Sequence, residues 1–256
     1  MINCLKMIFE KFLQAQDRLC RIFDRFLPVS FKRWGYRDFI LEILPGNLKP
    51  GFRVLDAGGG KRPVITLQQK QNLQLEVIGL DISAAELAAA PAGLYDSTFT
   101  ADLVTVRKLV EADIIVCLAV LEHVPDTGSA LKAIASMLKP GGRALIFVPC
   151  RNSLFARLNL LLPEHLKRSL LRLFFRRSSE QQGFKSYYDR CTPSAMKALA
   201  LESGLQVEEE LYYFQSAYFS VFLPLHAFYR LFTLLLRRCF GNEAAETFTL
   251  VLRKNP

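Results

Sequence analysis

The feature that most constrains this chain is a strand that ends in an acid and three glycines. The sequence reads RVLDAGGG from Arg53 to Gly60. Because glycine lacks a Cβ atom, its backbone amides can approach a ligand closely, and the turn can adopt positive φ before a helix begins. A second apolar run, Ile78 to Leu80, ends in Asp81, about 20 residues beyond the glycines, where a carboxylate can bind both ribose hydroxyls. The pair predicts a site for a nucleotide-type cofactor.

Glycine-rich loops also close strand-to-helix turns that bind nothing, so the pattern downstream matters. Asp102 follows a third short β-like run, and Asp113 to Leu118 reads as a buried parallel strand. A helix is expected from Ser129 to Leu138, stopped by Lys-Pro-Gly-Gly, and a strand follows from Arg143 to Val148. Residues 206–211 and 246–253 read as two last strands, and the final one alternates as an antiparallel strand would. These patterns predict one α/β domain with appendages.

The segments LDAGGG, GLDIS, VLEHVPD and LKPGGRALIFVP, in that order and spacing, resemble the class I S-adenosylmethionine-dependent methyltransferases, among them the ubiquinone/menaquinone-type and polysaccharide-cluster small-molecule enzymes. The resemblance covers residues 52–149. It implies S-adenosyl-L-methionine as cofactor and a Rossmann-like seven-stranded α/β sheet, mostly parallel with the last strand antiparallel, with helices on both faces and helical lid insertions. By the same resemblance, the cofactor-binding residues are Asp56, Ala57, Gly58, Gly59, Gly60, Asp81, Ile82, Asp102, Leu103, Leu118 and Ala119.

In this family the glycine loop holds the methionine end of the cofactor, the acid at Asp81 binds ribose, and the acid at Asp102 lies near the adenine amino group. The segment after the fourth strand lines the active site. His123 in that segment is the candidate catalytic base, since an imidazole titrates near neutral pH. A histidine here can instead pack beneath the cofactor or cap the next helix. The candidate substrate contacts are Glu122, Tyr187 and Tyr188.

The chain departs from the family pattern at two places, and each departure leads to an expectation about the site. Ala119 stands where ubiquinone-type enzymes usually carry a glutamate, so we expect no metal site. Lys61-Arg62-Pro63 stands where many relatives carry a third glycine, which makes the loop stiffer and more basic. Pro63 also breaks the G-x-G-x-x-G fingerprint of a nicotinamide dinucleotide enzyme, so that alternative is disfavoured.

The chain length and the cysteines indicate the number of cores and the cellular compartment. A chain of 256 residues can bury one substantial core. The six cysteines are scattered without a C-x-x-C pair, and they read as free thiols in a reducing cytosol. Charged residues interrupt the apolar N-terminal segment before a signal-peptide core can form, so we expect no export and a cytoplasmic location.

The net charge of +9 is concentrated outside the predicted catalytic core. Residues 1–37 carry eight Lys or Arg against three acids, residues 151–190 carry nine against three, and residues 38–150 carry ten against twelve. The basic residues lie on amphipathic segments, Met1 to Leu27 and Leu154 to Arg177, instead of on polar loops with exposed aromatics. This favours a membrane surface over nucleic acid as partner. The alternative is that both helices pack on the domain with solvated charged faces.

A third appendage, residues 212–240, is almost wholly apolar and aromatic. It is long enough to span a bilayer, but the strands on either side of it must pair in one sheet, so a single crossing is rejected. Pro224 and Arg230 inside it favour two short helices that form a hairpin dipping into one leaflet. The alternatives are a buried cap over a soluble substrate and a dimer interface.

The expected organisation is an N-terminal amphipathic helical lid (residues 1–37) and a methyltransferase domain (residues 38–256). The domain has two insertions, a basic amphipathic cap (residues 151–190) and an apolar hairpin with possible membrane contact (residues 212–241). Both insertions leave the carboxyl ends of strands, where parallel sheets bind ligands. We therefore expect O- or C-methylation of a hydrophobic small molecule or lipid-linked precursor at the cytoplasmic membrane surface. The alternative is a cofactor-binding protein that has lost catalysis and serves as a partner at the membrane.

Overall fold

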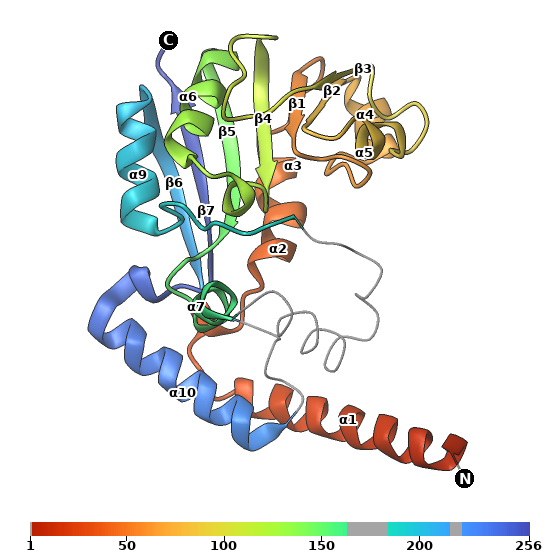
Figure 1. Cartoon of the computed structure of the whole chain (residues 1–256), viewed down its shortest axis with the longest axis vertical. Coiled ribbons are helices and arrows are strands. Elements are labelled where there is room, and N and C mark those ends of the chain that lie inside the picture. Colours follow the sequence, from red (N-terminus) through yellow and green to blue (C-terminus); the bar gives the residue numbers. More distant parts are fainter. Residues whose placement is uncertain (1, 163–183, 216–221) are drawn as a thin grey trace.

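The computed structural model describes residues 2–162, 184–215 and 222–256, which form a seven-stranded sheet of order β3-β2-β1-β4-β5-β7-β6 (Figure 1). β7 runs antiparallel to β5 and β6, and the pairs among β1 to β5 are parallel. This confirms the predicted Rossmann-like α/β fold. The strands are β1 Arg53–Ala57, β2 Glu76–Asp81, β3 Ser97–Thr100, β4 Ala112–Leu118, β5 Leu138–Pro149, β6 Leu205–Tyr213 and β7 Thr247–Lys254.

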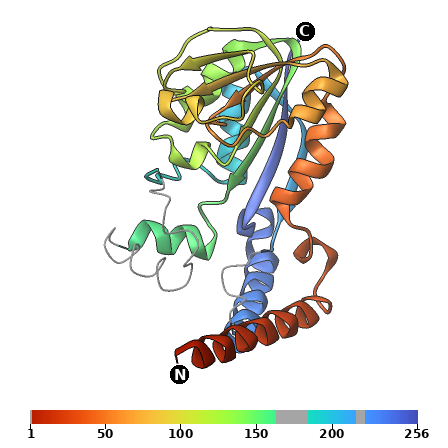
Figure 2. The ribbon, with the colours of Figure 1, turned by 90° about the vertical axis from the view of Figure 1, so that its right-hand side faces the viewer.

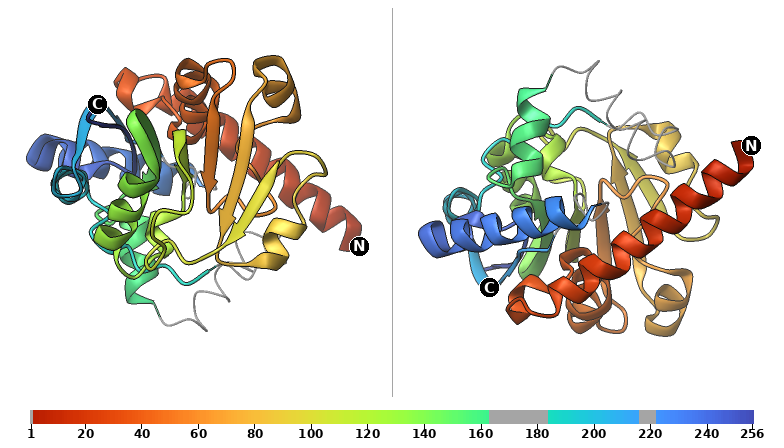
Figure 3. Two further views of the ribbon diagram at one scale, coloured as in Figure 1. Left: turned by 90° about the horizontal axis from the view of Figure 1, so that it is seen from above. Right: turned by 90° about the horizontal axis from the view of Figure 1, so that it is seen from below.

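Helices cover both faces of the sheet and create two apolar cores (Figure 3). Neighbouring residues of the central strands point to opposite faces, so Val54 belongs to one core and Leu55 to the other. The core around Leu55 contains residues of α6 Thr127–Met137 and α9 Pro193–Glu202. The core around Val54 contains residues of the helical stretch from α2 Gly35–Asp38 through the π-turn Phe39–Ile43 to α3 Leu44–Asn47. α4 Leu67–Leu73 and α5 Ala84–Ala88 follow β1 and β2.

The helix starts are set by side-chain caps. Asp126 accepts a hydrogen bond from the Ser129 amide, so α6 begins at Thr127, two residues before the predicted start. Thr66 and Gln69 form a reciprocal capping box at the start of α4. Thr192 caps α9, and Pro193 occupies its first position, where a missing N–H costs nothing.

Among the described residues, three helices lie beyond the carboxyl ends of the parallel strands: α1 Ile2–Asp24, α7 Leu154–Leu161 and α10 Leu223–Phe240 (Figures 1 and 2). α1 and α10 pack against each other and cross the end of the molecule that these strand termini face (Figure 3). The predicted basic helix from Leu154 to Arg177 is described only as far as Leu162, and residues 163–183 lie outside the described residues. No helix in the described ranges has the length and apolarity needed to cross a membrane.

The predicted hairpin of two short helices is wrong. β6 continues through Tyr213, and a single helix, α10, runs from Leu223 to Phe240. Pro224 does not break the helix because it lies in the first turn, where its missing N–H leaves no bond unmade. Arg230 does not interrupt the helix either, because its guanidinium is buried and donates to the main-chain oxygens of Phe31 and Phe214. Residues 216–221 of the predicted hairpin lie outside the described residues.

Candidate active site

The glycine loop after β1 fits closely against its neighbours, and an added Cβ at Gly58 or Gly59 would clash with them. Gly58 has a φ of +82°, and a Cβ there would lie 2.5 Å from a methyl group of Val120. A Cβ at Gly59 would lie 2.3 Å from the carboxylate of Asp56. The Gly58 amide donates to the Leu80 carbonyl (2.6 Å), which fixes the start of the loop. The Gly59 and Gly60 amides are therefore the loop donors to consider for a ligand.

Asp56, on β1 just before the loop, accepts hydrogen bonds that hold the loop in place. Its side chain is buried, and burial raises the pKa of the carboxyl to about 6. Its Oδ2 accepts hydrogen bonds from the Val64 amide (3.0 Å) and the Tyr95 hydroxyl (3.3 Å). The same hydroxyl lies 3.3 Å from the Gly60 carbonyl, so Tyr95 connects Asp56 to the last glycine of the loop. Gly79 on β2 leaves room for the Tyr95 ring, which a Cβ there would approach to 2.9 Å.

Asp81 ends β2 and faces the same loop. Its side chain is buried, its Oδ1 accepts from the Ser83 amide (2.9 Å), and burial raises the pKa of its carboxyl. Its Oδ2 lies 3.0 Å from the position of a Cβ at Gly60. A cradle that excludes any Cβ, with a carboxylate directed at it, fits the adenosyl cofactor that the resemblance implies.

The remaining predicted cofactor residues lie at neighbouring strand ends. Ala57 is the buried last residue of β1, and Ile82 follows β2 with an exposed side chain. Asp102 follows β3 and accepts from the Val104 amide (2.8 Å), while Leu103 is buried. Because β3, β2, β1 and β4 are adjacent and parallel, their carboxyl ends meet at one edge of the sheet. The other two predicted residues at this edge are Leu118 and Ala119, at the end of β4.

His123 lies in the short 3-10 turn Leu121–His123 that follows β4. Its Nδ1 is 3.1 Å from the carbonyl oxygen of Lys185 and 3.4 Å from the Ser186 hydroxyl. A carbonyl only accepts, so Nδ1 carries the hydrogen, and Nε2 of the neutral ring keeps its lone pair. Burial lowers the pKa of the imidazole, which favours that neutral form.

The residues predicted to contact substrate occupy different environments. Glu122 is buried, and burial raises the pKa of its carboxyl to about 8. Its main-chain carbonyl accepts from the amides of Tyr187 (2.8 Å) and Tyr188 (3.0 Å). Tyr188 is buried in the core, whereas the Tyr187 side chain is 38% exposed. The structure thus brings all three together, but only Tyr187 has a surface that a substrate can reach.

Sequence reasoning missed Tyr95 and the segment Lys185–Ser186. Tyr95 lies in the connection between β2 and β3, outside any motif, and no sequence signal marks it. Lys185 acts through its main-chain carbonyl, which any residue provides. Within the described ranges, no group of three or more His, Cys, Asp or Glu is placed to hold a metal ion. The described free cysteines are Cys20, Cys117, Cys150, Cys191 and Cys239.

Comparisons with known proteins show which family this chain resembles. The model of the methyltransferase domain family matches residues 14–210. A ubiquinone biosynthesis O-methyltransferase of Thiobacillus denitrificans is 30% identical over 166 residues, covering 62% of this chain and 66% of that protein. One of Xanthomonas axonopodis pv. citri is 28% identical over 176 residues, covering 66% and 69%. The chain thus spans about two thirds of the length of these relatives.

Solved structures show the same fold at low identity. An S-adenosylmethionine-dependent methyltransferase from Mesorhizobium loti superimposes with a TM-score of 0.53 at 16% identity, covering 83% of this chain and 96% of that one. A SAM-dependent methyltransferase from Methanosarcina mazei gives 0.51 at 17% identity, covering 84% and 97%. The dehydrogenase alternative finds no support in these relatives. The chain belongs to the methyltransferase domain family, within the class I S-adenosylmethionine-dependent methyltransferases.

Proposed function

We propose that this protein transfers the methyl group of S-adenosylmethionine to a hydroxyl oxygen of a small molecule that has an apolar part. The observation that carries the proposal is the arrangement of His123, whose Nδ1 hydrogen is held by the Lys185 carbonyl so that Nε2 is left as a base. The names of the curated relatives, which are O-methyltransferases, support oxygen as the acceptor atom. C-methylation remains the second possibility.

The cofactor is proposed to lie along the carboxyl edge of β1, β2, β3 and β4. The Gly59 and Gly60 amides would bind its methionine end, above the buried Asp56 and Ala57. The Asp81 carboxylate would accept hydrogen bonds from the ribose hydroxyls. The residues proposed to enclose the adenine and the exposed edge of the cofactor are Ile82, Asp102, Leu103, Leu118 and Ala119.

The reaction is an in-line displacement for which the protein supplies alignment and one proton acceptor. When bound, the cofactor would supply a methyl group on a positively charged sulfur, which would leave as the neutral thioether when the acceptor oxygen takes the methyl group. Nε2 of His123 would accept the hydroxyl proton, so the imidazole would carry the positive charge afterwards. Tyr187 is the proposed substrate contact, with Glu122 and Tyr188 positioning its main chain.

The test follows tritium from the labelled methyl group of the cofactor into phenols that carry alkyl or prenyl chains, and into extracts enriched in them. We expect the wild type to label such acceptors and His123→Ala to lose about 100-fold or more of the turnover. The Kd for S-adenosylhomocysteine should change less than about threefold, because His123 acts on the acceptor. Tight product binding without transfer to any acceptor would favour the alternative of a cofactor-binding partner that has lost catalysis.

We also propose that the protein works at a membrane surface, where an acceptor with an apolar part would be found. The basic and apolar appendages support this location. They include α1, with its basic residues, and α10, which contains no Asp or Glu. Both lie on the side of the molecule that the carboxyl strand ends face (Figure 1).

A further inference from the structure

Over residues 225–235, α10 buries its polar side chains and exposes most of its apolar ones, which is the reverse of the usual surface-helix pattern. His226, Arg230 and Thr233 are buried. On the opposite side, Phe228 is 68% exposed and Leu235 is 57% exposed. The rings of Phe228 and Phe232 stack with their centroids 6.3 Å apart, and we call the exposed apolar side chains on this side of α10 its ridge. The exposed apolar residues of this ridge are Leu225, Phe228, Leu231, Phe232 and Leu235.

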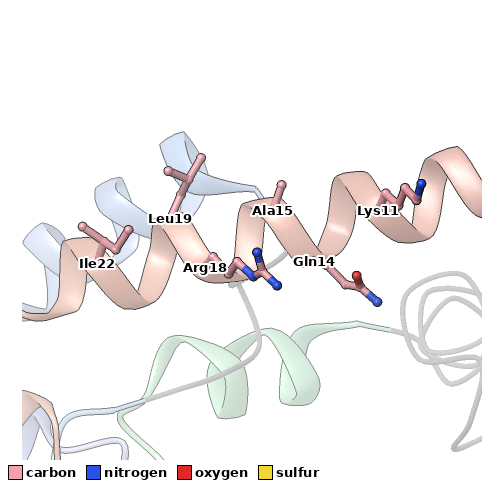
Figure 4. Close-up of a pocket in the computed structure, with 6 residues that line it drawn as sticks. All are labelled: Lys11, Gln14, Ala15, Arg18, Leu19 and Ile22. Atoms are coloured by element: carbon pink, nitrogen blue, oxygen red, sulfur yellow. The ribbon is translucent and has the colours of Figure 1, made fainter.

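α1 packs against α10 through the side that carries His226 and Arg230, and it has exposed apolar and basic residues of its own. Phe12, Leu19 and Ile22 are exposed on α1. Leu19 and Ile22 line a shallow groove together with Lys11, Gln14, Ala15 and Arg18 (Figure 4). Figure 4 shows Leu19, Ala15 and Lys11 projecting upward from the helix and Gln14 downward, with Arg18 in front between them. We call the α10 ridge, these apolar residues of α1 and the exposed Lys11, Arg18 and Arg25 the α1–α10 surface.

A buried charge cluster fixes the orientation of the α1–α10 surface. The Asp24 carboxylate of α1 is 2.9 Å from Nε2 of His226 and 3.1 Å from Nε of Arg230. Arg230 also donates to the main-chain oxygens of Phe31 and Phe214, and the Leu223 amide donates to the Gln16 side chain (2.9 Å). Because a buried charge needs all these partners, α10 cannot rotate its apolar ridge inward without leaving them unpaired. The outward ridge is thus a fixed feature of the fold.

We infer that the α1–α10 surface docks on an anionic lipid bilayer, an inference that rests on the proposed membrane location and names the surface that makes the contact. An apolar helix face flanked by basic residues is the pattern of interfacial helices, whose aromatic and leucine side chains enter the headgroup boundary. Lys11, Arg18 and Arg25 sit beside the apolar residues, where anionic headgroups would neutralise them. A second copy of this chain would bring two sets of these cations together, so charge complementarity favours lipid.

Docking in this orientation has a consequence for the acceptor. α1 and α10 lie beyond the carboxyl ends of the strands, the edge along which the cofactor is proposed to lie (Figures 1 and 3). An acceptor whose apolar part stays in the leaflet would then reach the site without crossing bulk water. The hairpin predicted from the sequence would have placed backbone inside the leaflet. A helix that lies flat on the surface inserts only its side chains.

The test is cosedimentation of the full chain with vesicles of phosphatidylcholine alone or with phosphatidylglycerol at 30 mol% (roughly the anionic content at which polybasic segments bind). We expect binding to the anionic vesicles, weakened by salt. Phe228→Ser with Leu235→Ser, and separately Arg18→Gln with Arg25→Gln, should each lower the partition coefficient about tenfold or more. The matched controls are Leu201→Ser, an exposed leucine on α9, and Lys49→Gln, and both should bind as the wild type does.

Three results would overturn the inference. The wild type could stay in the supernatant with every vesicle, the α10 double variant could bind as the wild type does, or the wild type could be a dimer in sedimentation velocity that the same variant dissolves. The Kd for S-adenosylhomocysteine is measured on each protein in parallel. Because the substituted residues lie outside the cofactor cradle, unchanged product binding with lost vesicle binding would separate this inference from the proposed methyl transfer.

Discussion

Replacing Tyr95 with phenylalanine tests whether this residue positions the cofactor loop. The change removes the hydroxyl that lies 3.3 Å from both the Asp56 carboxylate and the Gly60 carbonyl, and it leaves the ring against Gly79. A hydrogen bond of this kind contributes about 1 kcal/mol net, and both contacts are long and share one proton. If this hydrogen bond stabilises the binding conformation of the loop by that amount, its loss should raise the Kd for S-adenosylhomocysteine about fivefold.

The effect of Tyr95→Phe on the Kd should depend on pH. The Tyr95 hydroxyl lowers the pKa of Asp56, which burial has raised to about 6, so Tyr95→Phe should move that pKa upward. An ionised Asp56 would attract the ammonium group at the methionine end of the proposed cofactor, so the rise in Kd should be larger at pH 6.5 than at pH 8. Equilibrium dialysis of labelled product measures both values. Tyr212→Phe, which removes a phenol–carboxylate bond at Glu210 on β6, is the control. An unchanged Kd for Tyr95→Phe at both pH values would refute the positioning role.

Three further predictions concern the site. Gly59→Ala should weaken product binding more than tenfold because its Cβ would lie 2.3 Å from the Asp56 carboxylate, whereas Gly46→Ala, with open space at its Cβ, should leave the Kd unchanged. Glu122→Gln should be more stable relative to the wild type at pH 8 than at pH 6 in urea titrations. The pKa of Glu122 is raised to about 8, so the wild type loses stability as pH rises towards that value, by roughly 1–2 kcal/mol over this interval; parallel curves for the two proteins would count against the buried carboxyl. The wild-type kcat should fall only below about pH 6.5, because burial lowers the pKa of His123 and its neutral form is the base; an acid limb that persists in His123→Ala would assign the titration to another group.

The sequence was sufficient for the sheet because its strands carry local signals. β1 and β4 are apolar runs, so the pattern predicts strands there, and the carboxyl ends of parallel strands meet at one edge. β7, which was expected to alternate, is instead buried from Phe248 to Leu252. The prediction of a break in α10 failed because the carboxylate that pairs with Arg230 belongs to Asp24, 206 residues away in the sequence. Without that partner, a charged residue within an apolar run indicates a helix break. Long-range contact also explains why Tyr188 and Glu122, which were predicted to contact substrate, are buried. The segment after residue 184 folds back onto the turn that follows β4, and this return buries both.

The central claim is that the glycine cradle and Asp81 hold an adenosyl cofactor, and calorimetric titration with S-adenosylhomocysteine tests it most directly. We predict one binding site per chain in the wild type and at least a tenfold weaker Kd in Asp81→Asn, which keeps the size of the side chain and loses the charge that the ribose hydroxyls would meet. Absence of any binding heat for the wild type, across two temperatures so that a zero enthalpy is not mistaken for no binding, would contradict the claim.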